Sequence, residues 1–200
     1  MPFAISPTIP AGSLSSSTQP ALLSPDGALR LRPWRAEDTE VLLRAYRDPT
    51  IRRWHVRHVL TQDEATRWIA DYARFWQQET AVQWVITDAA DDEALGRMAL
   101  RTMNLQDGVA ECAYWVLPAA RGRGVAPRAL AALTEWAVGT AGFHRLELVH
   151  SVHNEASCRV AVKSGFALEG TRRESHLHAD GWHDTHLHGY VAGRAGELSA

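Results

Sequence analysis

The sequence lacks the features that mark membrane-spanning, secreted or nucleic-acid-binding proteins. No apolar run approaches the roughly 18 residues that a transmembrane helix needs. The formal net charge is only -2, so there is no strong overall positive field to attract a polyanion. Residues 1–24 hold neither lysine nor arginine and no continuous apolar stretch, unlike a signal peptide. We therefore expect a cytoplasmic protein that binds neither a membrane nor nucleic acid.

Cysteine is also scarce. Only Cys112 and Cys158 are present, and their separation fits no metal-binding spacing. Two reduced thiols in a cytosolic protein are the simplest interpretation, and a disulfide between them is the alternative. The rest of the composition, 46% hydrophobic and 22% charged over 200 residues, is typical of one globular domain.

The N-terminal segment differs in composition from the rest of the chain. Residues 1–24 are rich in serine, threonine and proline. Such a segment buries too little apolar surface to offset the entropy lost on ordering it. We therefore expect a tail over residues 1–24, disordered or draped over the domain. A single domain should cover residues 25–195, with a short tail at 196–200.

Hydrophobic periodicity predicts the element order β-α-α-β-β-β-α-β-α-β-β. Residues 106–108 and 180–181 have the composition of hairpin turns, which favours antiparallel pairing on either side of each. Thr61 and Glu64 have the spacing of a capping box, so a helix should begin there. A meander followed by βαβ crossovers predicts an α/β domain with a mixed sheet. Strands are predicted at 28–32, 82–87, 95–102, 109–117, 145–150, 166–179 and 182–191, and helices at 37–47, from 61 onward, at 129–138 and at 154–164.

A segment rich in glycine and arginine, residues 121–126, lies between a predicted strand and a predicted helix. Glycines let the backbone direct several N–H groups to one point, and a helix N-terminus adds positive charge. Arg121 and Arg123 can add charge-assisted hydrogen bonds. The segment therefore predicts a binding site for phosphate.

Two other interpretations of this segment compete. One is a flexible, solvated turn that binds nothing. The other is a dinucleotide-binding fingerprint, since Gly122-x-Gly124 follows a strand and Glu147 lies downstream. Pro127 stands where that fingerprint needs glycine or alanine for close helix–strand packing, and the preceding strand belongs to a predicted hairpin. Both features disfavour the dinucleotide interpretation.

Several motifs in order resemble the GNAT superfamily of N-acetyltransferases, and within it the RimJ/RimL type of ribosomal-protein enzyme. Arg121-Gly122-Arg123-Gly124-Val125-Ala126 matches the family pattern Gln/Arg-x-x-Gly-x-Gly/Ala. The strand at 110–118 looks like the one that precedes this pattern in that group. Residues 154–166 resemble its Asn-x-x-Ser helix and Lys/Arg-x-Gly-Phe exit, and residues 168–170 and 180–184 continue the match. The resemblance covers about residues 28 to 192.

The resemblance implies a fold and a reaction. The fold would be a central mixed, mostly antiparallel sheet of about six to seven strands, flanked by four helices, with two splayed central strands. The reaction would move an acetyl group from acetyl-CoA directly to a primary amine, so neither cysteine is needed as a nucleophile. A protein N-terminal α-amine is the first choice of acceptor. A small-molecule amine (an antibiotic or polyamine) and a non-catalytic acyl-CoA-binding module are the alternatives, and a homodimer is the family's habit.

The resemblance also assigns a cofactor site. The 121–126 turn would hold the pyrophosphate. Backbone groups of Trp115, Val116 and Leu117 would pair with the pantetheine arm and polarise the thioester carbonyl. Asn154 would bond the pantetheine, although asparagine is equally suited to cap a helix. The full set implied for acetyl-CoA is Trp115, Val116, Leu117, Arg121, Gly122, Arg123, Gly124, Val125, Ala126 and Asn154.

Three residues are predicted to be catalytic. Ser157 matches the family position thought to protonate or stabilise the departing thiolate, and its alternative is a solvated first-turn serine. The amine must be neutral to attack, so a base is useful. Glu111 lies on the strand beside the acetyl site, with a structural ion pair as its alternative. His176 lies near the position where the ribosomal enzymes are thought to carry a glutamate, and Glu174 competes for that alignment.

Aromatic residues and histidines complete the candidates. Trp54 and His55 follow the first helix, and with Trp84 they are predicted to line the acceptor pocket. The pairs His176-x-His178 and His186-x-His188 flank the last hairpin, which would place four imidazoles near one another if they share a sheet face. Because acetyl transfer needs no metal and histidines are common on solvated strand faces, we expect no metal site.

Overall fold

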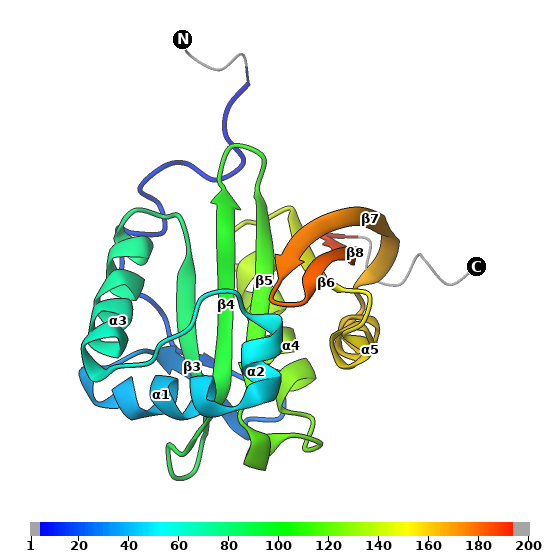
Figure 1. Cartoon of the computed structure of the whole chain (residues 1–200). Helices are drawn as coiled ribbons and strands as arrows, with labels where there is room; N and C mark the ends of the chain where they lie inside the picture. The colour runs from blue at the N-terminus through cyan, green and yellow to red at the C-terminus, as the bar shows by residue number, and fades with distance from the viewer. Residues whose placement is uncertain (1–4, 194–200) are drawn as a thin grey trace.

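One mixed sheet of eight strands, ordered β1-β2-β3-β4-β5-β6-β8-β7, forms the centre of the molecule (Figure 1). The computed structural model describes residues 5–193, so the predicted tail at 196–200 lies outside the described residues. Neighbouring strands pair antiparallel except β5 and β6, which are parallel. The strands are β1 (Leu22–Leu23), β2 (Leu29–Pro33), β3 (Val82–Asp88), β4 (Ala94–Asn104), β5 (Val109–Val116), β6 (Arg145–Ser151), β7 (Ala167–His178) and β8 (Gly181–Val191).

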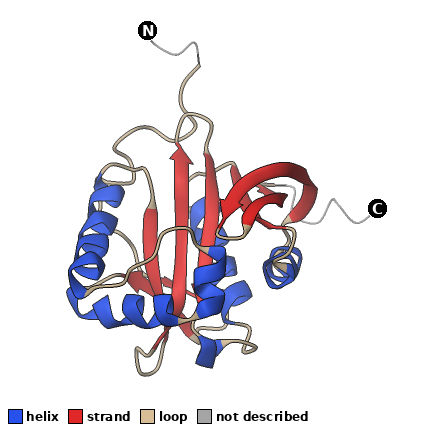
Figure 2. Cartoon of the chain, viewed as in Figure 1, coloured by secondary structure: helices blue, strands red, loops and turns tan. Residues whose placement is uncertain are grey.

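Helices cover both faces of this sheet, as Figure 2 shows. Helices α1 and α3 pack together on one face, and α4 packs on the other against strands β1, β2, β4 and β5. Helix α5 lies beside α4, over β6 and β7. The described α-helices are α1 (Thr39–Arg47), α2 (Pro49–Trp54), α3 (Gln62–Gln77), α4 (Val125–Gly139) and α5 (Glu155–Lys163).

The mixed, mostly antiparallel architecture predicted from the sequence is confirmed, but two short elements were not predicted. The described residues form eight strands and five α-helices, against an expected six to seven strands and four helices. Strand β1 is only two residues long and lies in the predicted tail. Helix α2 begins at Pro49, because the Asp48 carboxylate accepts the Ile51 N–H at 2.8 Å. The proline that ends α1 therefore also opens the next helix.

Local signals place the other elements where the sequence predicts them. The Thr61 hydroxyl accepts the Glu64 N–H, and the Glu64 carboxylate accepts the Thr61 N–H. This capping box begins α3. Gly165, with φ at 78°, allows the chain to leave α5 in the left-handed region and enter β7.

Side chains alternate between two cores along the strands. On β3, Val82, Trp84 and Ile86 point into the core beneath α4, whereas Val85 points into the core beneath α1 and α3. Helix α4 is apolar enough to be buried along most of its length. The sheet is therefore covered on both faces over β3 to β5.

The predicted N-terminal tail is draped over the domain, and is not detached from it over residues 5–24. Ile9 and Leu14 are buried in the core on the α4 face. The buried Glu79 carboxylate accepts backbone N–H groups of Gly12, Leu14 and Ser15 at 2.6 to 2.8 Å. The burial of this segment is hard to predict from the sequence, because its apolar residues are scattered and their partners lie far along the chain.

Candidate active site

The carboxyl ends of β5 and β6 separate, and this opening is the central feature of the site. Val109 to Cys112 pair with Arg145 to Leu148, and the described residues of the two strands show no pairing beyond these. Strand β5 leads onward to the 121–126 turn, and β6 leads to α5. Because the two strands are parallel, both motifs lie at the same edge of the sheet. The predicted splay of the two central strands is therefore present.

The glycine-rich turn has the backbone geometry that the sequence predicts for an anion site. Gly122 and Gly124 have φ values of 75° and 70°, in the left-handed region. Gly124 is the N-cap residue of α4 and supplies no side chain to that helix's first N–H groups. An added Cβ at Gly122 would meet nothing within 4 Å, so the turn faces open space. These N–H groups are available to a bound anion.

The two arginines of the turn have different surroundings. The Arg121 guanidinium donates to the Asp48 carboxylate at 2.6 Å and to the Val116 carbonyl at 3.2 Å. It therefore ties the turn to the start of α2 and to the end of β5. The Arg123 side chain is exposed and makes no hydrogen bond to the described part of the chain. Its charge is the one left free for a ligand.

The end of β5 offers one residue's backbone N–H to the opening. The Leu117 N–H donates to the Leu95 carbonyl at 2.8 Å, and the Leu117 carbonyl accepts from Ala120 at 2.9 Å. Successive strand residues direct their N–H and C=O groups to opposite sides. The backbone N–H of Trp115 therefore faces β4, as the Leu117 N–H does. The backbone N–H of Val116 faces the gap between β5 and β6. Of the three backbone positions predicted to pair with pantetheine, the geometry favours Val116.

Ser157 faces a tyrosine that is absent from the residues predicted from the sequence. The Ser157 hydroxyl lies 2.9 Å from the Tyr114 hydroxyl, and both residues line a cavity of about 100 Å³ in the opening. Burial raises the pKa of Tyr114 to about 12, so the phenol keeps its proton at neutral pH. Tyr114 lies in the strand that carries the family resemblance, but its partner is known only once the fold brings α5 against β5.

Asn154 also lines this cavity, and its side chain caps α5. Its carboxamide oxygen accepts the Ser157 N–H at 3.2 Å. The capping interpretation is thus realised in the structure. The carboxamide nitrogen can still donate to a ligand.

A bulge in the last hairpin directs His176 into the opening. Pairing between β7 and β8 shifts between Arg172 and His176, and Glu174 adopts a φ of 45° with its N–H on the Asp184 carboxylate. Bulges of this kind re-aim the side chains that follow them. His176 lines both cavities of the site. Burial lowers the pKa of His176 below its ordinary range, so its ring is neutral at pH 7.

The other candidate bases are placed differently. The Glu111 carboxylate forms an ion pair with Arg101 at 2.5 Å, which was the alternative for this residue. Neither Glu111 nor Glu174 is among the residues that line the two cavities. The geometry therefore favours His176 as the base.

A second cavity, of about 600 Å³, adjoins the first on the α1 and α3 face. Trp54 and His55, the two residues after α1 that were assigned to an acceptor pocket from the sequence, both line it. Burial, reinforced by Arg97 and Arg101, lowers the pKa of His55 to about 3. The wall is largely aromatic, and its charged side chains are those of Arg57, Asp71, Arg97 and Arg101.

Trp84 is not part of this pocket, so its assignment to the acceptor site was wrong. Its side chain is 0% exposed and lies in the core beneath α4. The indole N–H donates to the Pro20 carbonyl at 2.8 Å. Residue 84 is on the strand face opposite to the cavity, and this alternation could not be assigned before the sheet's two faces were known.

The two histidine pairs of the last hairpin do not meet. His176 and His178 line the larger cavity. His186 and His188 point toward α5, on the other face of the sheet. The arrangement of four imidazoles considered from the sequence is therefore absent from the described residues.

Comparison with known proteins identifies the family. A family model for the acetyltransferase (GNAT) domain matches residues 28–167. The chain belongs to the GNAT acetyltransferase family. It is therefore an acyltransferase, and the fold and the family predicted from the sequence are confirmed. None of the described helices of this GNAT protein is long and apolar enough to cross a bilayer.

Individual GNAT relatives are distant in sequence. N-acetyltransferase YoaA of Bacillus subtilis is 23% identical over 168 residues, which is 83% of this chain and 94% of that protein. The ribosomal-protein-serine acetyltransferase of Escherichia coli is 27% identical over 101 residues, 50% of this chain and 56% of that protein. RimL, a ribosomal L7/L12 α-N-protein acetyltransferase solved with coenzyme A, superposes with a TM-score of 0.79 at 19% identity, covering 86% of this chain and 98% of RimL.

Proposed function

We propose that this GNAT enzyme transfers the acetyl group of acetyl-CoA to the N-terminal α-amine of a protein or peptide. The observation that carries the proposal is the opening between β5 and β6, with the two-glycine turn at its edge and the Tyr114–Ser157 contact inside it. The opening and its glycine turn suit a phosphate-bearing arm, and the Tyr114–Ser157 contact suits the sulfur at the end of that arm.

The donor half of the site follows from this geometry. The free N–H groups at the start of α4 and the exposed Arg123 would hold the pyrophosphate. The pantetheine arm would enter the opening, where the Val116 N–H is directed. The presence of coenzyme A in the RimL structure supports this cofactor.

The chemistry then needs one proton acceptor and one proton donor. The ammonium form of the acceptor loses a proton to the neutral His176, directly or through water. The amine nitrogen bonds to the thioester carbonyl carbon, and the C–S bond breaks as the tetrahedral intermediate collapses. The thiolate takes the Tyr114 hydroxyl proton, with Ser157 hydrogen-bonded to that hydroxyl. The nitrogen of the new amide gives its second proton to water, and the Tyr114 oxygen regains a proton from solvent. The products are the N-acetylated acceptor and free coenzyme A.

The charges of the larger cavity bear on the acceptor. Three arginines and one aspartate line it, and Arg101 is paired with Glu111, so the cavity lacks the excess negative charge that would attract a polycation such as a polyamine or aminoglycoside. An N-terminal α-amine has a pKa near 7.7–8.0, and a useful fraction of it is neutral at pH 7. The relationship to a ribosomal-protein-serine acetyltransferase supports the same class of acceptor.

A thiol-release assay over an amine panel tests this function. The panel would hold peptides with free and blocked N-termini, polyamines and aminoglycosides, each with acetyl-CoA. We expect thiol release with free N-terminal peptides and none with the same peptides blocked. If only polyamines were acetylated, the acceptor would be a small-molecule amine and not a protein N-terminus. Binding of acetyl-CoA without thiol release from any amine would favour the non-catalytic module.

The cofactor site is tested separately by thermal unfolding. Saturating acetyl-CoA should raise the Tm. At a ligand concentration of 100 times the Kd, binding stabilises the folded state by about 2.7 kcal/mol. Gly124→Asp should abolish the shift, because a carboxylate would fill the turn and repel the pyrophosphate. Gly139→Asp, at the other end of α4, is the matched control and should keep it. An unchanged shift in Gly124→Asp would place the pyrophosphate elsewhere.

A further inference from the structure

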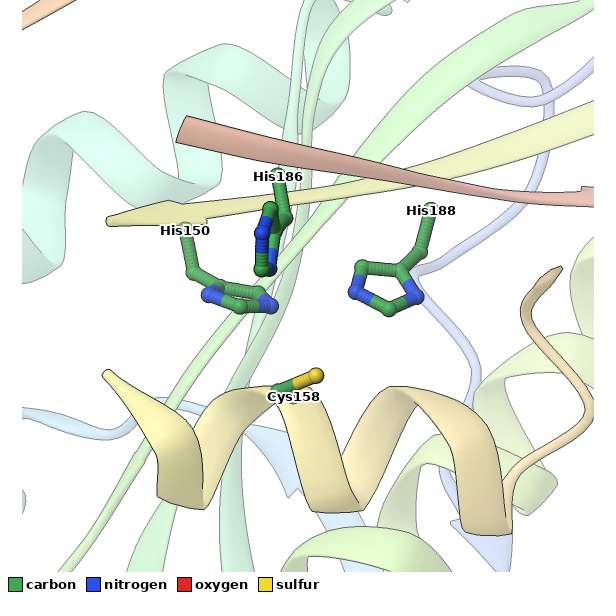
Figure 3. A group of neighbouring side chains, drawn as sticks. All are labelled: His150, Cys158, His186 and His188. Atoms are coloured by element: carbon green, nitrogen blue, oxygen red, sulfur yellow. The ribbon is translucent and has the colours of Figure 1, made fainter. Parts of the chain in front are cut away.

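Four metal-ligating side chains converge between the sheet and α5, and none of them has a role in the proposed acetyl transfer, although His150 also lines the smaller cavity. His150 comes from β6, His186 and His188 come from β8, and Cys158 comes from α5 (Figure 3). One ligand atom from each residue lies within 4.8 Å of all the others. Figure 3 shows the three rings and the thiol directed into one common space.

Strand register and helix position together build this cluster. His150 pairs with His186, and His188 pairs with Leu148, so both β8 histidines project from the same face as their partners. Leu148 belongs to the core beneath α4 and α5, which identifies that face. Helix α5 packs over β6 there and brings Cys158 against the rings. Side chains from three separate elements are thereby joined.

In two of the rings a hydrogen bond at Nδ1 leaves the other nitrogen, Nε2, as an acceptor. We call these Nε2 atoms the inner nitrogens. His150 Nδ1 lies 2.8 Å from the Ser151 carbonyl, and His188 Nδ1 lies 3.3 Å from the Phe166 carbonyl. A carbonyl oxygen only accepts, so each Nδ1 carries the proton and each Nε2 carries a lone pair. This is how metal-binding histidines are held, with one N–H on a carbonyl and the other nitrogen on the ion.

Those inner nitrogens have no partner among the described residues. His150 and His188 are 6% and 0% exposed, and the Nε2 atom of each is buried without a hydrogen bond. His186 Nδ1 is also buried and unpaired. A buried polar atom without a partner is unfavourable, because it has lost its hydrogen bonds to water. Three such atoms beside one thiol indicate a missing ligand that accepts electron pairs, which is a metal cation.

We propose that His150, Cys158, His186 and His188 form a zinc-binding site. Thiolate and imidazole are the donors that zinc takes in closed, four-coordinate tetrahedral sites, and they do not suit Mg²⁺ or Ca²⁺, which prefer oxygen. At zinc distances of about 2.0–2.3 Å, tetrahedral ligand atoms lie roughly 3.4–3.8 Å apart. The cluster therefore closes around the ion by side-chain movements of about 1 Å, and the Cys158 thiol releases its proton to solvent.

The ion would tie α5 to β6 and β8. This helix follows its cap residue Asn154 and carries Ser157, so the site would help to position the residues at the opening. From the sequence we expected no metal site, and the histidines considered together there were His176, His178, His186 and His188. Nothing in the spacing of His150 and Cys158 connects them with the last hairpin before the fold is known.

Direct metal binding tests the site. Full-length, tag-free protein stripped with a chelator and dialysed should bind one equivalent of Zn²⁺ in competition with a chromophoric chelator. Co²⁺ should give visible bands typical of tetrahedral coordination and a thiolate charge-transfer band. Zn²⁺ should also protect Cys158 of the unmodified protein from alkylation, which is read by peptide mass spectrometry and requires no variant.

Matched variants assign the ligands. Cys158→Ser should abolish the charge-transfer band, and both Cys158→Ser and His188→Gln should weaken Zn²⁺ binding by more than the roughly 10–100-fold cost of losing an outer-shell partner. Cys112→Ala and His144→Ala, at a core thiol and an exposed imidazole, should bind as the unmodified protein does. The proposal is overturned if the unmodified protein binds no stoichiometric Zn²⁺, if Cys158 is alkylated equally with and without it, or if Cys158→Ser keeps the thiolate band.

Discussion

At the scale of single residues, the contact between Tyr114 and Ser157 unites the two halves of the donor site. Their hydroxyls meet at 2.9 Å although the residues are 43 positions apart. Tyr114 belongs to the strand that separates from β6, and Ser157 belongs to the helix that follows β6. In the proposed reaction this pair would lie beside the thioester sulfur, and the raised pKa of Tyr114 keeps its phenol protonated at neutral pH.

This contact predicts the effect of a small substitution. Tyr114→Phe removes the proton donor and leaves the ring, so kcat should fall by about 10²-fold, at the lower end of the range for general acid–base catalysis. The Kd for acetyl-CoA, measured by titration calorimetry, should stay the same. Tyr190→Phe, which changes a tyrosine packed on Phe166 away from the opening, is the control. Equal kcat values for the Tyr114→Phe and unmodified enzymes would remove Tyr114 from the mechanism.

At the scale of elements, a buried carboxylate is one of the groups that hold the N-terminal segment. Glu79 lies just beyond α3 with a φ of 54°, and its side chain accepts three backbone N–H groups of the segment. Two tryptophan N–H groups hold the same segment, since Trp76 donates to Ser17 and Trp84 donates to Pro20. The segment thereby covers one side of the core beneath α4.

Glu79→Gln should weaken this attachment. The amide keeps one acceptor oxygen but places an NH₂ group against backbone donors, so the free energy of unfolding should fall by about 1–3 kcal/mol. Chemical denaturation measures this change. Glu135→Gln, on the exposed face of α4, should have no measurable effect. A stability of Glu79→Gln equal to that of Glu135→Gln would mean that the carboxylate does not hold the segment.

At the scale of the whole molecule, two cores on opposite faces of the sheet leave an opening where β5 and β6 separate. The larger cavity lies on the α1 and α3 face, and the proposed zinc ligands lie on the α5 face.

His55, on the wall of the larger cavity, couples the stability of the fold to pH. Burial and two nearby arginines lower its pKa from 6.5 to about 3.

The lowered pKa of His55 makes the folded state less stable in acid. Below pH 6.5 the unfolded chain protonates His55, while the folded protein does not do so until about pH 3. Stability from this residue is therefore present above pH 6.5 and is lost as the pH falls toward 3, by at most about 1.4 kcal/mol per pH unit. His55→Gln should flatten the pH dependence of the unfolding free energy between these values, and exposed His144→Gln should not. Parallel pH profiles for His55→Gln and the unmodified protein would contradict the coupling.

Local signals in the sequence were sufficient for most of the fold. The capping box at Thr61, the hairpin turn before Val109 and the glycine after α5 each depend on neighbours within a few residues, and each is where it was predicted. Strand β1 and helix α2 were missed. The first has only two residues, and the second begins at a proline that was expected only to end a helix.

The sequence by itself determined the family, the order of the main elements and the glycine turn, because short motifs and periodicity carry that information. Only the tertiary structure decided which side chains meet: Ser157 with Tyr114, Glu111 with Arg101, and Trp84 with the core instead of the pocket. Such contacts depend on strand register and on which sheet face a residue occupies. A shift of one residue reverses the face, and register is set by packing across the whole domain.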